Sequence, residues 1–309
     1  MILGPGSRPV GAAAWLPHVM LALSMALMGS NVVIGRAVTA EMPPAGFIFW
    51  RCLLAALLTL PFVWGAFCKD LPVLLANWRH IVAMGLAWSV TGHALTYTAL
   101  QTTTAINAAL IAATQPALTV IVARLALGDR VGPRQGLGIV AALIGVAVIV
   151  VRGDWSVLLE LRFAIGDLFV VLSMASFAVY NVLAKTAPPG LNPFALLVAI
   201  MIAGLAFLIP VHGIELLFTD LRMQVSWFAA WTVAFTAIFA TIFSVVLWNV
   251  GVQRLGPGPA SMYINVVPLF ATALAVIFLG EALAPFHALG FVLIVGGVYL
   301  ATRSATAPR

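Results

Sequence analysis

The stretch that decides the fold occurs twice in the chain. The segment QTTTAINAALIAATQPALTVIVARLALGD (101–129) can be laid without a gap over QRLGPGPASMYINVVPLFATALAVIFLGE (253–281). The overlay sets Pro116 over Pro268 and a Leu-Gly-Asp ending over a Leu-Gly-Glu ending. A proline and a helix-ending triplet that both fall in register indicate an internal duplication.

The duplication extends beyond this segment. At the same offset Gly138 matches Gly290 and Gly145 matches Gly297, so each half carries two glycines seven residues apart on one helix face, a spacing that allows close helix contact. Near the start, LSMALMGSNVVIGR (23–36) matches LSMASFAVYNVLAK (172–185), in which Asn31 falls on Tyr180 and Arg36 on Lys185.

Composition predicts an all-α polytopic membrane protein. Of the 309 residues, 63% are hydrophobic and 8% charged, which is more apolar material than one soluble core can bury. A helix needs about 20 apolar residues to cross a bilayer. Ten such runs are predicted, near 18–38, 45–66, 79–99, 103–127, 134–151, 166–186, 192–211, 227–250, 257–279 and 285–302.

Ten runs in two copies make a repeat unit of five helices, with boundaries at 1–152 and 153–309. Because five is odd, the second copy must enter the membrane from the opposite side. Inverted repeats of this kind are typical of transporters whose substrate site lies near the midplane, between two halves that rock about it.

The positions of Lys and Arg predict the orientation. Placing both termini in the cytoplasm puts most Lys and Arg residues on the inner side, as multi-pass proteins of a bacterial inner membrane require. The net charge of +6 therefore reflects orientation in the membrane. No basic soluble face exists that would bind nucleic acid.

The chain resembles a known family on several of these features. The Trp50-Arg51 pair, the proline-centred fourth and ninth helices and the LGD and LGE endings are similar to the EamA repeats of the drug/metabolite transporter superfamily. The resemblance covers nearly the whole chain, and within the superfamily it is strongest to bacterial aromatic amino acid exporters. It implies a basket-like inner-membrane exporter of amino acids and related metabolites with a broad range, and a structural role for Arg51.

A polar stripe marks the third predicted helix. Ser89, His93, Tyr97 and Gln101 follow one another at steps of four, and the matching helix carries Thr241, Asn249 and Gln253. Unpaired polar groups in hydrocarbon are costly, so these faces should point into the bundle. Hydrogen bonding between helices explains any one of these residues, whereas the stripe as a whole favours a substrate cavity.

The predicted cavity combines neutral polar groups with aromatic rings. Amides can meet both ends of a zwitterion, and ring faces can stack on an aromatic side chain or hold an ammonium group. Besides the stripe, the predicted lining residues are Asn31, Trp88, Asn107, Gln115, Tyr180, Asn181, Ser244, Trp248, Tyr263 and Asn265.

Charges within the predicted helices bear on coupling. Arg51 can bind a substrate carboxylate, or it can pair with an outer-side acid such as Glu41 or Glu281. No Asp or Glu lies in the middle third of any predicted helix, so proton coupling would rest on His93. Facilitated export driven by the substrate gradient is therefore predicted.

Other functions find less support. No zinc-protease or serine-hydrolase motif and no buried acid pair occurs, so the chain is predicted not to be an enzyme and to hold no cofactor or metal. An inverted repeat with broken helices fits alternating access better than a channel. The predicted partners are a small-molecule substrate and membrane lipid, with no obligate protein partner. The alternative is an EamA carrier of nucleosides, sugars or drugs, with proton coupling through His93.

Pro116 and Pro268 predict paired bends. A proline inside a helix removes one backbone hydrogen bond, which a membrane tolerates only where neighbours or water satisfy the freed carbonyl. The bends either shape the bundle statically or lie beside a cavity about which the halves rearrange. Val267 stands where Gln115 has its amide, so the proline is shared and the glutamine belongs to one half.

Overall fold

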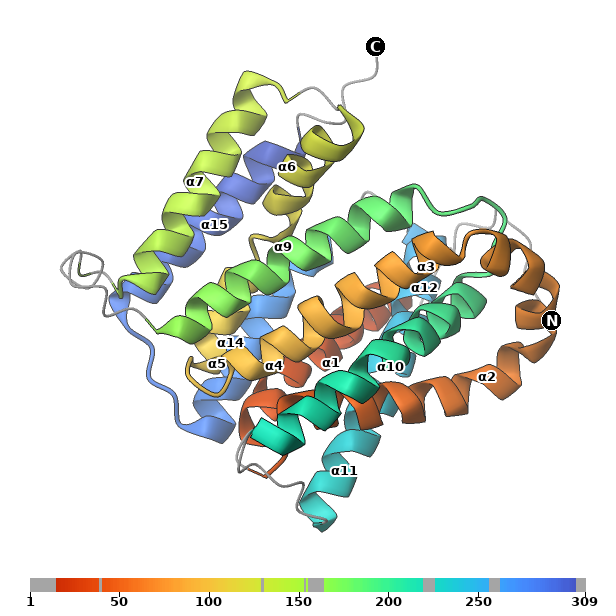
Figure 1. Cartoon of the computed structure of the whole chain (residues 1–309). Coiled ribbons are helices and arrows are strands. Elements are labelled where there is room, and N and C mark those ends of the chain that lie inside the picture. The colour runs from red at the N-terminus through yellow and green to blue at the C-terminus, as the bar shows by residue number, and fades with distance from the viewer. Residues whose placement is uncertain are drawn as a thin grey trace.

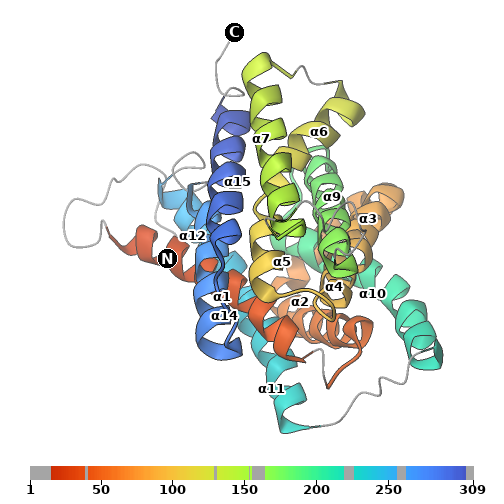
Figure 2. The ribbon, with the colours of Figure 1, turned by 90° about the vertical axis from the view of Figure 1, so that its left-hand side faces the viewer.

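The computed structural model describes residues 15–38, 41–128, 131–152, 154, 164–218, 226–255 and 262–303. Every regular element in these ranges is a helix, which confirms the predicted all-α class there. Helices α7 and α15 lie side by side in both views of the molecule (Figures 1 and 2), and α5 and α6 contact both of them.

The first half of the chain contains α1 (Leu16–Val38), α2 (Pro44–Ala76), α3 (Trp78–Gly85), η1 (Leu86–Ala94), α4 (Leu95–Ala99), α5 (Ala105–Ala112), α6 (Gln115–Leu127) and α7 (Pro133–Val150). The end predicted for the second helix, near 66, is wrong, because α2 continues to Ala76. Helix α2 includes the charged pair Lys69-Asp70. Asp70 is buried, and its carboxylate accepts a hydrogen bond from the backbone N–H of Asn192 at 2.7 Å.

The second half contains α9 (Ile165–Lys185), α10 (Pro193–Phe218), α11 (Trp227–Phe235), η2 (Thr236–Phe243), α12 (Ser244–Leu255), η3 (Met262–Val266), α14 (Val267–Leu279) and α15 (Pro285–Arg303). Helix α10 runs on to Phe218, beyond the end predicted near 211. The start predicted for the ninth helix at 257 lies outside the described residues.

Six of the described helices are long and apolar enough to cross a membrane. The pair α5 and α6, bent by 44° at a short break, raises the number to seven when it is taken as one span. Helix α14 and most of α15 are shorter apolar helices. Several spans in one chain make this a multi-pass membrane protein.

The two matched Leu-Gly endings stop two helices in the same way. Gly128 follows α6 with φ 72°, and Gly280 follows α14 with φ 66°, both in the left-handed region where glycine carries no steric penalty. The backbone N–H of Gly128 bonds the carbonyl of Arg124, and that of Gly280 bonds the carbonyl of Ala275. The duplicated triplet is therefore a duplicated helix C-cap.

Helices α7 and α15 pack through the four matched glycines. A Cβ on Gly138 would lie 2.4 Å from the carbonyl oxygen of Gly297, and a Cβ on Gly145 would lie 2.8 Å from the carbonyl oxygen of Gly290. The predicted close contact is confirmed. Because the numbers rise along α7 as they fall along α15, the two repeat-matched helices run antiparallel, which is the relation that an inverted repeat predicts.

Helices α2 and α10 cap each other. The Glu215 carboxylate, near the end of α10, accepts the backbone N–H groups of Ala45 at 3.0 Å and Gly46 at 3.1 Å, in the first turn of α2. At the other end, Asp70 of α2 accepts the N–H of Asn192, just before α10 begins. Negative charge at a helix N-terminus satisfies free N–H groups and is favoured by the helix dipole. The exchange fixes α2, which carries the site described below.

Glu281 caps α5 in the same manner, and this cap should stabilise the protein. Its carboxylate accepts the N–H groups of Ala105 at 2.7 Å and Ile106 at 2.9 Å. We expect Glu281→Ala to destabilise the protein by about 1–2 kcal/mol, the usual worth of a helix cap with favourable charge. Thermal melting of the detergent-purified protein measures the loss. Glu281→Gln keeps one acceptor and should lose less. Equal melting temperatures for all three proteins would contradict the assignment.

Candidate functional site

Arg51 is the centre of the site. It lies on α2 and is 2% exposed. Its Nε donates to the hydroxyl of Thr241 at 3.1 Å, and its Nη1 donates to Oδ1 of Asn31 at 3.1 Å and to the Tyr97 hydroxyl. Its Nη2 lies 3.3 Å from Nε2 of His93. One side chain thus joins α1, α2, α4 and both π-helical segments, η1 and η2.

On the Nη1 side of the guanidinium, Arg51, Tyr97 and Asn31 form a closed triangle of hydrogen bonds. The Tyr97 hydroxyl, which accepts from Nη1, itself donates to Oδ1 of Asn31 at 2.8 Å. The Tyr97 ring is 2% exposed and packs edge-on against Phe47, with 4.9 Å between ring centroids. Gly35 leaves room for it, since a Cβ there would lie 2.4 Å from the ring. Packing therefore fixes the hydroxyl that Arg51 uses.

Hydrogen bonding assigns the tautomer of His93. Its Nδ1 lies 2.8 Å from the carbonyl oxygen of Trp88, which can only accept, so Nδ1 carries the proton. Its Nε2 faces Nη2 of Arg51, which can only donate, so Nε2 is the acceptor. His93 is neutral in this arrangement. Its ring lies between those of Trp88 and Phe177, at centroid distances of 4.5 and 4.9 Å.

Both repeats contribute a π-helical segment to the site. The segments η1 and η2 occur at corresponding places, in the third and eighth predicted helices. In each, a side chain bonds the carbonyl five residues earlier, as His93 does to Trp88 and as Thr241 does to Thr236 at 2.9 Å. π-Helical turns are rare and are frequent at functional sites. Arg51 touches one residue of each segment.

Among the residues that the structure describes, Arg51 has no acidic partner. Across the described ranges, no carboxylate lies within 4.0 Å of its guanidinium nitrogens. The predicted alternative of pairing with Glu41 or Glu281 is wrong, since Glu41 accepts the Ser226 hydroxyl at 2.8 Å and Glu281 caps α5. A buried cation held by neutral acceptors alone is costly, and an anionic ligand would compensate it.

The structure gathers part of the predicted cavity lining around Arg51. Asn31, His93 and Tyr97 bond it directly, and Trp88 holds His93. Two residues of this group, Arg51 and Thr241, are not among the predicted lining residues, although Arg51 is named as a group that can bind a carboxylate and Thr241 lies on the helix that matches the polar stripe. The 152-residue offset that pairs Thr241 with Ser89 (241 − 89) was the signal that pointed to Thr241.

Ser89 itself lies elsewhere in the bundle. It is fully buried against Gly204 of α10, where a Cβ would come within 1.9 Å of its hydroxyl oxygen. That oxygen has no hydrogen-bond partner among the described residues. Ser89 therefore belongs to a tight contact between η1 and α10, outside the group around Arg51.

Other predicted lining residues bond helices to one another. The Asn181 amide donates to Thr119 at 3.2 Å, and Thr119 donates to the carbonyl of Gln115 at 2.9 Å, which ties α9 to α6. Ser244, the first residue of α12, donates to the carbonyl of Ala240 in the preceding segment η2 at 2.8 Å. The Tyr263 hydroxyl lies 2.6 Å from Nδ1 of His18. Gln101, Tyr180 and Trp248 are half-buried, and the side chain of Asn265 lies outside the described part.

Asn107 belongs to a second polar network. Its amide nitrogen donates to the buried carboxylate of Asp167, with contacts of 3.3 and 3.4 Å, and its Oδ1 lies 3.1 Å from Nε2 of His287. Thr103 also donates to Asp167. This network connects the start of α5 with the starts of α9 and α15, so it joins residues of both halves.

The paired prolines stand at two helix starts. Pro116 is the second residue of α6, after a break that follows the end of α5 at Ala112, and Pro268 is the second residue of α14, after η3. Proline is well placed in a first helical turn, where its missing N–H is not needed. Both proline-centred helices are thus interrupted, and the interruption in the fourth carries the 44° bend.

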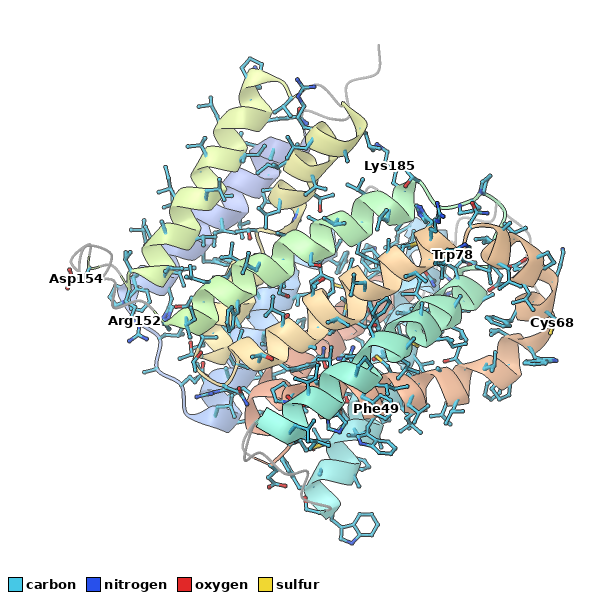
Figure 3. All side chains as sticks on the ribbon, viewed as in Figure 1. Phe49, Cys68, Trp78, Arg152, Asp154 and Lys185 are labelled. Carbon is cyan, nitrogen blue, oxygen red and sulfur yellow. The ribbon has the colours of Figure 1, made fainter. Side chains whose placement is uncertain are left out.

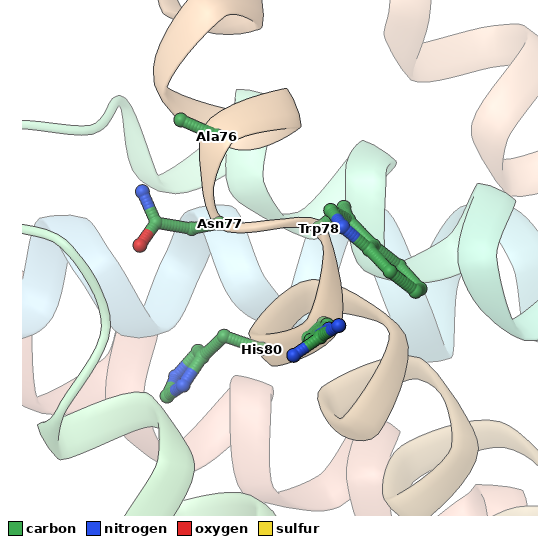
Figure 4. A pocket seen from close by; sticks show the side chains of 5 residues that line it. Ala76, Asn77, Trp78 and His80 are labelled. Atoms are coloured by element: carbon green, nitrogen blue, oxygen red, sulfur yellow. The ribbon is translucent and has the colours of Figure 1, made fainter.

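A separate pocket of about 370 Å³ lies at the turn between α2 and α3 (Figure 4). It is lined by Ala76, Asn77, Trp78, Arg79 and His80. The Arg79 guanidinium lies 5.5 Å from the Trp78 ring centroid. Trp78 lies well apart from Phe49, which comes two residues before Arg51 in the chain (Figure 3).

The described residues contain no group of three His, Cys, Asp or Glu side chains that could hold a metal.

Known proteins resemble the chain over most of its length. YyaM of Bacillus subtilis strain 168, an uncharacterized transporter, is 27% identical over 94% of this chain and 95% of that protein. An uncharacterized transporter of Archaeoglobus fulgidus is 26% identical over 92% and 96%. A probable terminal-alkyne amino-acid exporter of Streptantibioticus cattleyicolor is 28% identical over 66% of each chain.

The fold also has a match among solved structures. One crystal structure superposes with a TM-score of 0.58 over 93% of this chain and 98% of that one, at 21% identity, a likeness that concerns the fold alone. The EamA-like transporter family matches the chain twice, over residues 15–151 and 164–303. With two EamA repeats that together span most of its length, the chain belongs to the EamA-like transporter family.

Proposed function

We propose that the protein exports neutral amino acids, aromatic ones included, across the bacterial inner membrane. The buried guanidinium of Arg51, held by neutral acceptors with no carboxylate beside it among the described residues, carries this proposal. A carboxylate is the ligand that a guanidinium fork binds best. The substrate would supply the missing negative charge.

The surroundings of Arg51 fit the rest of an amino acid. A zwitterion brings no net charge into the membrane, so it needs no second fixed charge in the protein. The half-buried rings of Trp88 and Phe177, on either side of His93, offer faces for an apolar or aromatic side chain. Ring faces of this kind also attract an ammonium group. The set distinguishes amino acids from sugars and nucleosides, which lack the carboxylate.

The similarity to a probable terminal-alkyne amino-acid exporter supports the same substrate class. Transport would proceed by alternating access between two inverted five-helix repeats, 1–152 and 153–309, with ten spans and both termini in the cytoplasm. The antiparallel packing of α7 with α15 and of α2 with α10 supports this arrangement. The breaks before Pro116 and Pro268 would serve as hinges.

Transport would be facilitated, driven by the substrate gradient. His93 is neutral, with its proton directed to Trp88 and its free nitrogen toward Arg51. Protonating Nε2 would set a second positive charge against the guanidinium and remove the acceptor. The buried acid Asp167 belongs to the second network, and among the described residues no carboxylate bonds Arg51 or His93, so none at the site is in place to exchange a proton with the substrate.

Flux in proteoliposomes tests the proposal. We expect saturable uptake of labelled phenylalanine or leucine that follows the substrate gradient and is inhibited by other neutral amino acids. A pH gradient alone should produce no uphill accumulation, because nothing at the site couples protons. Accumulation driven by pH alone would overturn the facilitated mechanism, and its loss in His93→Ala would identify the coupling group.

Resistance of expressing cells tests the substrate class. Cells producing the protein should tolerate toxic analogues of neutral amino acids better than cells with empty vector. Tolerance of toxic purine analogues should not change, because these lack a carboxylate for Arg51. Protection against purine analogues alone would favour a nucleoside carrier instead.

A further inference from the structure

We propose that the substrate carboxylate binds the Nε and Nη2 side of Arg51, in place of the neutral acceptors Thr241 and His93. The inference rests on the proposed function and adds to it the side of the guanidinium that is used and the residues that compete with the substrate. It follows from the hydrogen bonds that Arg51 makes in the structure.

The guanidinium is nearly saturated with acceptors. It has five N–H donors. One on Nε goes to Thr241, two on Nη1 go to Asn31 and Tyr97, and one on Nη2 goes to His93. A carboxylate that binds with both oxygens takes N–H groups from two different nitrogens. At least one of the present acceptors must therefore leave.

The acceptors on Nη1 are the harder ones to displace. Tyr97 donates to the same Asn31 oxygen that accepts from Nη1, at 2.8 Å, so the three groups form a closed triangle. Both Nη1 hydrogens are in use. Removing either acceptor disturbs two hydrogen bonds, and the buried Tyr97 ring, packed edge-on against Phe47, has little room to move.

The acceptors on Nε and Nη2 are the easier ones to displace. Each makes one bond to Arg51, at 3.1 Å from Thr241 and 3.3 Å from His93. Each also has a second bond that survives its departure. The Thr241 hydroxyl still donates to the carbonyl of Thr236 at 2.9 Å, and His93 still donates to that of Trp88 at 2.8 Å. No buried donor is left unsatisfied when the carboxylate takes their place.

The two displaced residues lie on the two π-helical segments, His93 on η1 of the first half and Thr241 on η2 of the second. Arg51 joins these segments through its contacts with Thr241 and His93. A bound carboxylate would accept the Arg51 N–H groups that now bond Thr241 and His93. Substrate binding would thus be sensed by both repeats at once, through a single side chain.

The kinetics of two acceptor-free variants test the proposal. His93→Phe keeps a ring between Trp88 and Phe177, and Thr241→Val keeps the side-chain shape, but neither has an acceptor for Arg51. In both, the empty carrier holds an unsatisfied N–H that the substrate then satisfies. We expect the KM for a neutral amino acid to fall about three- to tenfold, because an unsatisfied buried donor costs on the order of 1 kcal/mol.

Matched variants separate this effect from general disturbance. His93→Gln and Thr241→Ser retain an acceptor, so their KM should stay near that of the wild type. Tyr97→Phe removes an acceptor from the Nη1 side and should raise the KM, because the guanidinium loses its alignment. A merely structural defect lowers the amount of active protein, and therefore the maximal rate, without lowering the KM. Thr241→Val alone decides the question where His93→Phe does not accumulate in the membrane.

Two results would overturn the inference. A raised KM in both His93→Phe and Thr241→Val would show that these residues hold the substrate site together and do not compete for it. A lowered KM in Tyr97→Phe, with no change in the other two, would place the carboxylate on the Nη1 side. Either result leaves the proposed function intact, whereas absence of saturable flux in the wild type would contradict the proposed function itself.

Discussion

Arg51→Gln is expected to lower the transport efficiency for neutral amino acids by about 100-fold or more. Two charge-assisted hydrogen bonds from the guanidinium to a carboxylate are worth on the order of 3 kcal/mol together, and 1.4 kcal/mol corresponds to a factor of ten. Glutamine offers one amide donor pair without the charge. The measurement is initial uptake over a range of substrate concentrations in proteoliposomes, divided by the amount of protein incorporated.

Arg51→Lys is the matched control, since lysine keeps the charge but loses the planar fork. We expect an intermediate loss of about tenfold. If Arg51 only holds helices together, its variants will melt at lower temperature and incorporate poorly, while the protein that does fold will show the KM of the wild type. That outcome would contradict a role in binding the substrate.

Gly297→Ala is expected to destabilise the protein strongly. A Cβ at this position would lie 2.5 Å from the backbone nitrogen of Ala142 and 2.5 Å from the carbonyl oxygen of Gly138. Backbone atoms cannot swing aside as a side chain can, so α7 and α15 must move apart. Overpacking of this kind costs about 1–3 kcal/mol or more, which corresponds to a fall of roughly 2–10 °C in melting temperature.

The neighbouring Gly296 provides the control. It lies on the same helix, and a Cβ there would meet nothing within 4 Å. Gly296→Ala should leave the melting temperature unchanged or raise it slightly, because alanine is a better helix former by about 1 kcal/mol. On the partner helix, Gly138→Ala should behave like Gly297→Ala, and Gly136→Ala, which also has open space, like Gly296→Ala. Equal melting temperatures within each pair would show that the glycine contact does not stabilise the bundle.

The repeat was predictable because the matched residues lie at positions where backbone conformation or close packing allows few other residue types. Gly128 and Gly280 both take the left-handed conformation that ends a helix, and few residues other than glycine do so without strain. The four matched glycines of α7 and α15 lie where no side chain fits. Such positions allow few alternatives, so their spacing alone located two helix ends and one helix interface.

The site was only partly predictable, because it depends on which helix faces meet. The four-residue steps of the third helix placed Ser89, His93 and Tyr97 on one stripe, yet the helix changes to a π-helical turn at Leu86. That change shifts the register within the stripe. His93 and Tyr97 reach Arg51, whereas Ser89 packs against Gly204. No local sequence pattern predicts a π-helical turn.

The role of Arg51 could not be read from its own segment. A lone arginine among apolar residues fits an ion pair, a structural tie or a ligand equally well. The difference lies in its partners, which come from Asn31, Tyr97 and Thr241, far apart in the chain. Only the folded arrangement shows that all of these are neutral. Among the described residues, the hydrogen bonds of Arg51 exclude the ion pair, a distinction that the sequence of its own segment does not contain.

Counterflow in proteoliposomes gives the most direct test of the central claim, that Arg51 binds a substrate carboxylate. Vesicles loaded with unlabelled phenylalanine and given a trace of labelled phenylalanine outside should show transient accumulation of label. Added leucine should suppress the overshoot. Phenylalanine amide, which has the same side chain without the carboxylate, should leave it unchanged at equal concentration. Suppression by the amide as strong as that by leucine, or no overshoot at all, would contradict the claim.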